Sequence, residues 1–131
     1  MAIVCLDTDV LVDIIRADEP LSRLRGIRYL GSCTTIITLL ELYYGAFKSG
    51  KQDDLALIEF LKNDIVALEL SEGDVKLAGK IMADLDKKGL KVDFRDVVIG
   101  AICINEKITL MTRNIKHFKR MESYGLSITT V

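Results

Sequence analysis

The sequence is poor in several residue types that define common kinds of protein site. It contains no tryptophan, one proline, one histidine and three cysteines among 131 residues. With a single histidine and no CxxC pair, a zinc site with several His or Cys ligands is excluded in practice. A Ser-His-Asp triad would depend entirely on His117, which lies in a charged segment typical of a protein surface.

The cysteines and the short apolar runs also bear on where the protein works. Cys5, Cys33 and Cys103 each lie among apolar residues, as expected of small core residues in an intracellular protein. The longest apolar runs are far shorter than a membrane span, and no secretory signal is visible at the N-terminus. We therefore expect a cytoplasmic protein with no membrane association, and a single domain over residues 1–131.

The stretch 3–13, reading IVCLDTDVLVD, is the one around which the rest of the chain is organised. Residues 3–6 form an apolar run of strand length, and helical spacing begins beyond Asp7. Asp7 and Asp9 therefore stand at a strand-to-helix junction, where ligands bind in open parallel sheets. Two acids there are a candidate cation site, although Asp is also a favoured residue at an ordinary helix start.

Strand-length apolar runs alternate with helical patterns along the rest of the chain. Strands are expected at 31–35, 65–68 and 108–111, with a β-rich tail at 127–131. Helices are expected at 36–47, 53–62, 71–88, 93–106 and 114–121, with a short helical piece at 21–27 after Pro20. The helix at 71–88 opens with a capping-box sequence and is followed by Gly89, a typical helix stop. This alternation predicts an α/β fold in which a parallel sheet lies between two helical layers.

Glu41 is the only charged residue between Arg28 and Lys48, on a helix that is apolar almost all round. Such a helix is expected to be buried, and a buried carboxylate needs a cation, hydrogen bonds or a proton. A capping box formed with Thr38 is a purely structural alternative for Glu41. Tyr43, Tyr44 and Phe47 on the same helix are interpreted as core or subunit-contact residues.

Further acids and an amide occur near the start of two later helices. Asp93 and Asp96 precede the apolar helix 97–104, where an N-cap at Asp93 and a third helical position at Asp96 would explain both. Thr112 and Asn114 follow the strand 108–111, and either could cap the next helix. Asn114 could equally offer its carbonyl oxygen to a ligand or orient a water.

These junctions share a pattern, because carboxylate or amide side chains follow strands whose ends meet at one rim of a parallel sheet. Several oxygen ligands without imidazole or thiolate suit a hard cation, Mg²⁺ or Mn²⁺. If Asp7, Asp9, Glu41, Asp93 and Asp96 share a cleft, the rest of the molecule carries +4 against an overall charge of −1. A mildly basic surface around an acidic, cation-filled pocket suits a polyanionic substrate.

Taken together, four motifs resemble the PIN-domain ribonucleases, in particular the VapC-type toxins of toxin–antitoxin pairs. The motifs are LDTDVLVD at 6–13, TTIITLLELYYG at 34–45, FRDVVIGA at 94–101 and LMTRNIKHFKR at 110–120. They occur in the family's order and spacing and cover nearly the whole chain. The resemblance implies a PIN-like three-layer α/β/α fold with a central parallel sheet of about five strands.

The resemblance also implies a set of site residues. Asp7, Glu41 and Asp96 fall on the family's three acidic metal-site positions, and Asn114 falls on a fourth position that is often Asp. This departure removes one negative charge and places strong binding of a second metal in doubt. Asp9 and Thr112 match accessory positions. Asp93 has no firm counterpart and is interpreted as a cap, with a site role left open.

The implied function is hydrolysis of RNA phosphodiester bonds by a Mg²⁺-dependent endoribonuclease, with Mn²⁺ as a second candidate ion. Asp7 and Asp96 would hold the cation directly, and Glu41 would bind it or orient a water. Four basic residues near the fourth position could hold the RNA backbone, or could form a solvated helix face: Arg113, Lys116, Lys119 and Arg120. The resemblance further implies a homodimer and a small cognate antitoxin that occludes the cleft.

Three other protein classes share parts of these motifs. A haloacid-dehalogenase-like phosphatase matches Asp7 and Asp9 but expects Thr or Val where Leu11 stands, and it leaves Glu41 unexplained. A receiver-like signalling module lacks its acceptor Asp and its Lys at the expected strand ends. The segment Gly45–Lys51 approaches a P-loop but follows a helix rather than a strand. A PIN-fold module that binds partners without cutting RNA stays as the non-enzymatic alternative.

Overall fold

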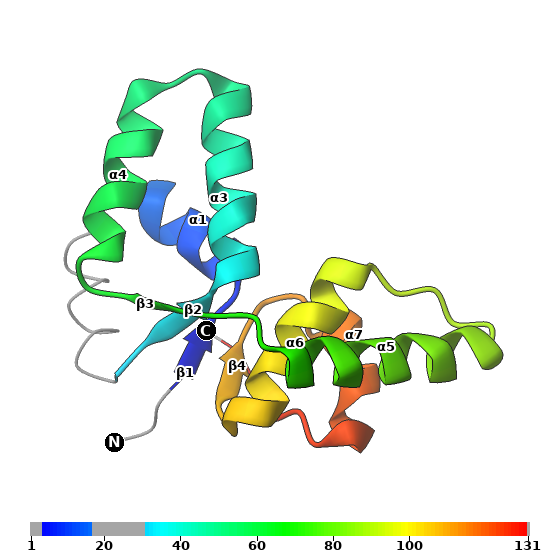
Figure 1. Cartoon of the computed structure of the whole chain (residues 1–131). Coiled ribbons are helices and arrows are strands. Elements are labelled where there is room, and N and C mark those ends of the chain that lie inside the picture. The colour runs from blue at the N-terminus through cyan, green and yellow to red at the C-terminus, as the bar shows by residue number, and fades with distance from the viewer. Residues whose placement is uncertain (1–3, 17–30, 131) are drawn as a thin grey trace.

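The computed structural model describes residues 4–16 and 31–130 (Figure 1). The predicted helical piece at 21–27 lies outside them. In chain order the first half contains β1 (Val4–Leu6), α1 (Thr8–Arg16), β2 (Cys33–Thr35), α3 (Ile36–Ser49), α4 (Gln52–Lys62) and β3 (Val66–Leu68). The second half contains α5 (Glu72–Lys87), α6 (Phe94–Glu106), β4 (Thr109–Met111), α7 (Ile115–Phe118), the 3₁₀ helix η1 (Lys119–Tyr124) and β5 (Ile128–Thr129).

The five strands form one parallel sheet in the order β3-β2-β1-β4-β5. Strand β1 lies at its centre, with Cys5 opposite Cys33 of β2 on one side and Leu110 of β4 on the other. Parallel neighbours need crossover connections, which the intervening helices supply. The predicted α/β architecture with about five parallel strands is confirmed.

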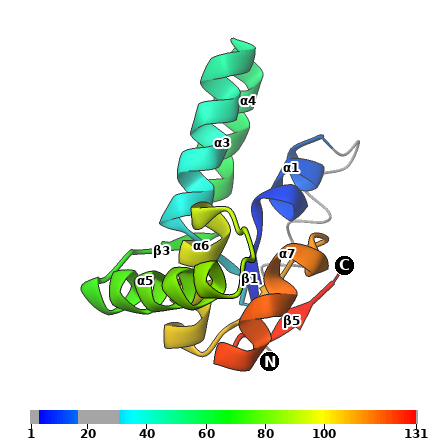
Figure 2. The same cartoon turned by 90° about the vertical axis from the view of Figure 1, so that its right-hand side faces the viewer.

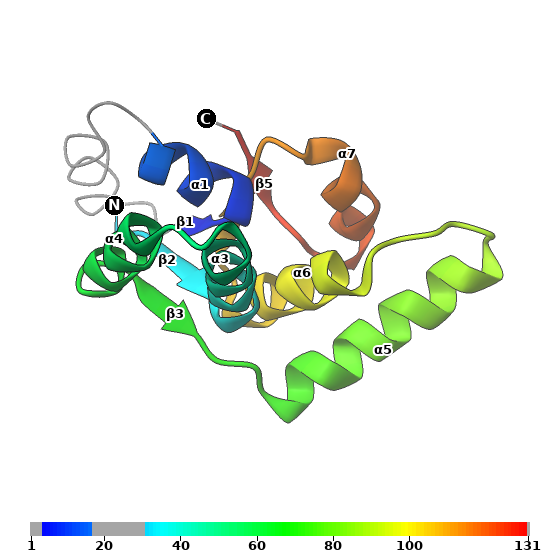
Figure 3. The same cartoon turned by 90° about the horizontal axis from the view of Figure 1, so that it is seen from above.

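Alternating side chains of β1 pack against two different helical layers. Val4 and Leu6 belong to a core cluster with α1, α3 and α4, whereas Cys5 belongs to a second cluster with α5, α6 and η1. Successive residues of a strand point to opposite faces of the sheet, so these clusters mark its two faces. Seen from above, α5, α6 and α7 lie on the opposite side of the strands from α4 (Figure 3). All three cysteines are buried, as expected.

Helix α3 is less buried than its composition predicts. It pairs with α4 as a hairpin that projects beyond the sheet in two perpendicular views (Figures 1 and 2). Leu42 and Ala46 are buried, but Leu40, Tyr44 and Phe47 are 62%, 62% and 69% exposed. The expectation of a helix buried all round is therefore wrong, because within residues 4–16 and 31–130 only one face of this projecting hairpin packs against other elements. Tyr44 and Phe47 are not core residues.

The helix ends follow the local signals in most places. Ser71 and Asp74 form the predicted capping box of α5, and Gly89 adopts a left-handed conformation with φ of 70° just beyond its end. The helix expected at 114–121 ends as an α-helix at Phe118 and continues as the 3₁₀ turn η1, which closes at Gly125. The predicted β-rich tail contains the short strand β5.

Among the helices of the described residues, none has both the length and the apolarity needed to cross a membrane. The sheet matters for function through its geometry. Because all strands run in parallel, the residues that follow β1, β2 and β4 emerge at the same edge. That edge is the place where the predicted site residues are expected to meet.

Candidate active site

An open pocket of about 520 Å³ lies at the carboxyl edge of the sheet. We call it the acidic pocket, and it is lined by Asp7, Thr8, Asp9, Val12, Asp13, Glu41, Asp96, Arg113 and Asn114. The lining comes from the β1–α1 junction and α1, from α3, from the first turn of α6 and from the β4–α7 junction. All four predicted catalytic residues, Asp7, Glu41, Asp96 and Asn114, therefore contribute to one pocket.

Asp7 is the most deeply placed carboxylate of the pocket, with only 4% of its surface exposed. Its Oδ1 accepts a hydrogen bond of 2.8 Å from the Thr8 N–H, and its Oδ2 accepts one of 2.7 Å from the Thr112 hydroxyl. Burial raises the pKa of Asp7 to about 6, against the opposing effect of these two hydrogen bonds. The negative charges of Asp9 and Asp96 raise this pKa further.

Thr112 and Asp9 link the β1–α1 junction to the β4–α7 junction. The buried Thr112 hydroxyl, which donates to Asp7, also accepts the N–H of Asn114 at 3.0 Å. Asp9 accepts the Val10 N–H at 2.8 Å through one oxygen and the Arg113 N–H at 3.0 Å through the other. Both residues thus hold these two junctions together. This geometry supports the accessory role that the resemblance implies for them.

Glu41 reaches the pocket from the second turn of α3. The Thr8 hydroxyl donates to its Oε1 at 2.9 Å, and its Oε2 lies 4.0 Å from Nη1 of Arg95. Burial raises the pKa of Glu41, whereas the Thr8 hydrogen bond and the Arg95 charge lower it. The capping box between Thr38 and Glu41 is not formed, so that structural alternative is wrong. Thr35 caps α3 instead, because its hydroxyl accepts the Thr38 N–H at 3.1 Å.

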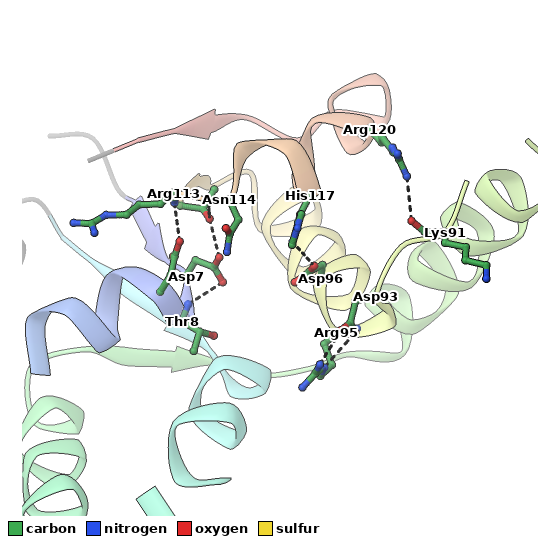
Figure 4. Close-up of polar contacts among 12 residues, drawn as sticks. Asp7, Thr8, Lys91, Asp93, Arg95, Asp96, Arg113, Asn114, His117 and Arg120 are labelled. Atoms are coloured by element: carbon green, nitrogen blue, oxygen red, sulfur yellow. Dashed lines mark hydrogen bonds and ion pairs between the residues drawn. The ribbon is translucent and has the colours of Figure 1, made fainter. Parts of the chain in front are cut away.

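Asp93 and Asp96 have different roles at the start of α6. Asp93 is the N-cap, since its Oδ1 accepts the Arg95 N–H at 2.9 Å, and it does not line the acidic pocket. Asp96 stands three residues further and faces the pocket, where Nδ1 of His117 lies 3.4 Å from its Oδ2 (Figure 4). Burial, followed by repulsion from Asp93, raises the pKa of Asp96, and His117 opposes this effect.

Asn114 precedes α7, but its side chain makes no capping hydrogen bond. Figure 4 shows it beside Asp7, on the side that faces Asp96. Its amide is therefore available to the pocket rather than used by the helix, as one of the two sequence-based interpretations proposed.

The four basic residues proposed to hold RNA do not form one group. Arg113 lines the pocket, but its guanidinium is paired with Asp13. Arg120 lies well away from Asp7 and donates to the Lys91 carbonyl at 3.1 Å (Figure 4). Lys116 and Lys119 are exposed and do not line the pocket. The geometry thus brings only Arg113 of this set to the acidic residues.

Three residues near the site were not predicted from the sequence to belong to it. Thr8 links Asp7 and Glu41, Arg95 lies beside Glu41, and His117 pairs with Asp96. Thr8 and Arg95 stand next to predicted acids in the chain, which is the only signal the sequence offered. The pairing of His117 with Asp96 had no such signal.

The donor set suits a hard divalent cation, since the pocket offers carboxylate, amide and hydroxyl oxygens. Within residues 4–16 and 31–130, no three acidic, histidine or cysteine side chains are grouped closely enough to hold a metal ion by themselves. Mg²⁺ is commonly bound through one or two carboxylates and several waters, so an open pocket of this kind fits it. The pKa values of Asp7, Glu41 and Asp96 are all raised, as is typical of acids clustered at a functional site.

Comparison with known proteins agrees with this geometry. The PIN domain model matches residues 4–123. Ribonuclease VapC2 of Haemophilus influenzae is 32% identical over 119 residues, covering 88% of this chain and 89% of that protein. The tRNA(fMet)-specific endonuclease VapC of Shigella flexneri is 30% identical over 118 residues, with the same two coverages.

Among solved structures, VapBC2 from Rickettsia felis bound to a DNA fragment from its promoter contains a chain of the same fold. It superposes with a TM-score of 0.82 at 27% identity and covers 98% of each chain. The phosphatase and receiver interpretations are set aside by these matches. With an acidic pocket at the carboxyl edge of a five-stranded parallel sheet, this chain belongs to the PIN-domain family, among the VapC ribonucleases.

Proposed function

We propose that the protein is a divalent-cation-dependent endoribonuclease that acts as the toxin of a toxin–antitoxin pair. The observation that carries this proposal is the convergence of Asp7, Glu41, Asp96 and Asn114 on one open pocket. These residues come from four separate segments of the chain, and their meeting is a property of the fold. Hydrolysis of a phosphodiester is a reaction that such oxygen-rich sites perform with Mg²⁺ or Mn²⁺.

Asp7 and Asp96 are the proposed direct ligands of the cation, with Glu41 as a third ligand or as a group that orients a water. When bound, the cation would lower the pKa of the attacking water and stabilise the charge that develops on the phosphorus oxygens. Hydrogen bonds within the chain hold two of these proposed ligands in place. Thr112 and the Thr8 N–H hold the two oxygens of Asp7, and the Thr8 hydroxyl holds Glu41.

The substrate is proposed to be RNA with an accessible single-stranded segment, because an open pocket at a sheet edge admits an extended strand. One relative is named a tRNA(fMet)-specific endonuclease. Initiator tRNA is therefore the first defined RNA to test for this chain.

A cognate antitoxin and a homodimer are proposed as the partners of the protein. Support for the antitoxin comes from the structures of related VapBC pairs, in which the similar chain is present with its antitoxin. An antitoxin that covers the acidic pocket would block access of RNA to Asp7 and Asp96. The homodimer rests on the family resemblance, and the mass of the purified protein in solution tests it.

The deciding experiment is cleavage of labelled RNA by the purified, antitoxin-free protein. An unstructured RNA and an initiator tRNA transcript would be incubated with Mg²⁺, with Mn²⁺ and with EDTA. Asp7→Asn and Asp96→Asn should abolish metal-dependent cleavage. Asp86→Asn, which removes one exposed carboxylate from α5 outside the pocket, is the matched control.

Each outcome has a distinct meaning. Cleavage that needs the cation and is lost in both pocket variants would support the nuclease and its ligands. Cleavage that survives in both variants would indicate a contaminating nuclease or a wrong site assignment. Binding of RNA without cleavage, with both ions and both RNAs, would favour the non-catalytic PIN-fold module.

A further inference from the structure

Arg95 stands at the rim of the acidic pocket and was not among the basic residues proposed from the sequence. It is the second residue of α6, directly before Asp96. Its Nη1 lies 4.0 Å from Oε2 of Glu41, which lines the pocket. Its side chain is 48% exposed. A cation that is open to solvent therefore adjoins the pocket on the Glu41 side.

The guanidinium of Arg95 is held in a defined orientation by Asp93. Nε of Arg95 donates to Oδ1 of Asp93 at 3.2 Å, and Nη2 donates to Oδ2 at 2.7 Å (Figure 4). This forked contact uses two of the five N–H donors that an arginine carries. The remaining donors face Glu41 at long range and solvent, so a second acceptor can be bound without releasing Asp93.

Arg95 is placed against the local electrostatic preference of its helix. A cation in the first turn of a helix opposes the positive end of the helix dipole, which favours anions. Asp93 already caps α6 by accepting the Arg95 N–H, an interaction that needs no particular side chain at position 95. A residue that breaks a local rule beside a site is a candidate for a functional role.

The negative charge of the acidic pocket would repel an RNA phosphate, and Arg95 is placed to offset this repulsion. Among the described residues, five carboxylates line the acidic pocket, and Arg113, the one cation among those lining residues, is paired with Asp13. An RNA phosphate that approaches the pocket must overcome the repulsion of these carboxylates even when one cation is bound. A guanidinium at the rim can offset this repulsion and bind a phosphate through two parallel hydrogen bonds.

We propose that Arg95 binds a phosphate of the RNA next to the scissile bond, on the Glu41 side of the pocket, and that Asp93 is the positioning residue that orients it. This inference rests on the proposed function, because it assigns a substrate contact to that same site. Arg95 contacts substrate without taking part in bond breaking. Its removal should therefore weaken RNA binding more than it slows the chemical step.

The test compares Arg95→Gln and Arg95→Lys with Lys80→Gln, which removes one positive charge from an exposed position of α5. KM and kcat are measured on an RNA that the wild-type protein cleaves, at several salt concentrations. Arg95→Gln should raise KM about tenfold, the effect of losing one charge-assisted contact, with kcat changed less than twofold. The dependence of log KM on log salt should become shallower by about 0.7, the value for one lost phosphate contact on single-stranded RNA.

Arg95→Lys keeps the charge but not the fork, so its KM should lie between those of the wild type and Arg95→Gln. Asp93→Asn keeps an N-capping oxygen but removes the carboxylate that orients the guanidinium. Introduced alone into the wild-type protein, Asp93→Asn should raise KM. In the Arg95→Gln background it should not raise KM, since only a negative charge is then removed. Equal effects in both backgrounds would contradict the positioning role of Asp93.

Failure of this inference can be distinguished from failure of the proposed function. RNA binding is measured with the Asp96→Asn protein, which should not cleave RNA, and with the double variant that also carries Arg95→Gln. The added substitution should weaken binding. If the wild type cleaves RNA but Arg95→Gln and Lys80→Gln share the same KM and salt dependence, Arg95 is not a phosphate contact. The same conclusion follows if Arg95→Gln changes only the Mg²⁺ concentration required, because Arg95 would then act through Glu41. If no RNA is bound or cleaved at all, both proposals fail.

Discussion

The hydroxyl of Thr112 donates a 2.7 Å hydrogen bond to Oδ2 of Asp7, a residue 105 positions earlier in the chain. Thr112 is fully buried and also accepts the N–H of Asn114. One hydroxyl thus connects the carboxylate after β1 with the loop after β4. The contact holds Asp7 in place and stabilises its ionised form, so it links the fold directly to the charge state of the site.

Replacing Thr112 with Val should lower both stability and RNA cleavage. It leaves a buried carboxylate oxygen and the Asn114 N–H without this partner, at a cost of about 1–3 kcal/mol of the free energy of unfolding. Loss of a donor to the carboxylate raises the pKa of Asp7, so the acidic limb of the pH–activity profile should move to higher pH. Thr112→Ser keeps the hydroxyl and should retain the wild-type profile. A profile for Thr112→Val that does not move would contradict this role.

The metal-free protein should become less stable as the pH rises from about 4 to about 6. Burial raises the pKa of Asp7 from its ordinary 3.8 to about 6, so the folded state binds this proton more tightly than the unfolded state does. The stabilisation is complete below pH 4 and is lost as the pH passes 6. For Asp7 alone it amounts to at most about 3 kcal/mol.

Asp7→Asn removes this titration and should flatten the dependence of stability on pH in this range. It should also raise the stability of the metal-free protein at pH 7.5. Chemical denaturation at pH 4.5, 6 and 7.5 in EDTA checks both effects. Equal wild-type and variant curves at all three values would show that Asp7 does not titrate in this range.

Mg²⁺ should stabilise the folded wild-type protein at neutral pH. A ligand that binds only the folded state adds about 2.7 kcal/mol to the free energy of unfolding at a hundred times its Kd, which corresponds to several degrees in Tm. Asp7→Asn and Asp96→Asn should lose most of this increase, and Asp86→Asn should keep it. An equal increase in all four proteins, measured by thermal unfolding, would place the cation elsewhere.

Capping of α3 can be separated from the chemistry of Glu41. Thr35→Ala removes the hydroxyl that accepts the Thr38 N–H and should cost about 1 kcal/mol or more, because the position is fully buried. Glu41→Gln should leave the helix cap intact while reducing cleavage, since Glu41 bonds to Thr8 and not to the N-terminus of α3. A loss of stability in Glu41→Gln equal to that in Thr35→Ala, measured by denaturant titration, would contradict this separation.

Much of the fold could be predicted from the sequence because its signals are local. The capping box at Ser71 and Asp74, the N-cap at Asp93 and the stop at Gly89 involve residues within a few positions of each other. Alternation of strands with helices then implies parallel pairing. It also predicts that the residues after β1 and β4 meet at one edge, where the pocket is found.

The wrong predictions concern residues whose neighbours in the structure are distant in the chain. The spacing of Thr38 and Glu41 suggested a cap, whereas Glu41 is bound by Thr8 across 33 positions. The apolar composition of α3 suggested complete burial, which depends on how many other elements surround the helix. Helix α3 projects with α4 beyond the sheet, and so its outer face has no such neighbours among the described residues.

By itself, the sequence determined the order of the elements, the caps of α5 and α6 and the set of acids that follow the strands. Hydrogen bonds within a turn and the periodicity of apolar residues are encoded locally, so they can be read from the chain. The tertiary structure alone decided that the Thr8 hydroxyl donates to Glu41. It also decided that Asp13 pairs with Arg113 and that Arg95 borders the pocket. Such pairings depend on how separate helices are placed on the sheet, which is set by packing of the whole core rather than by spacing along the chain.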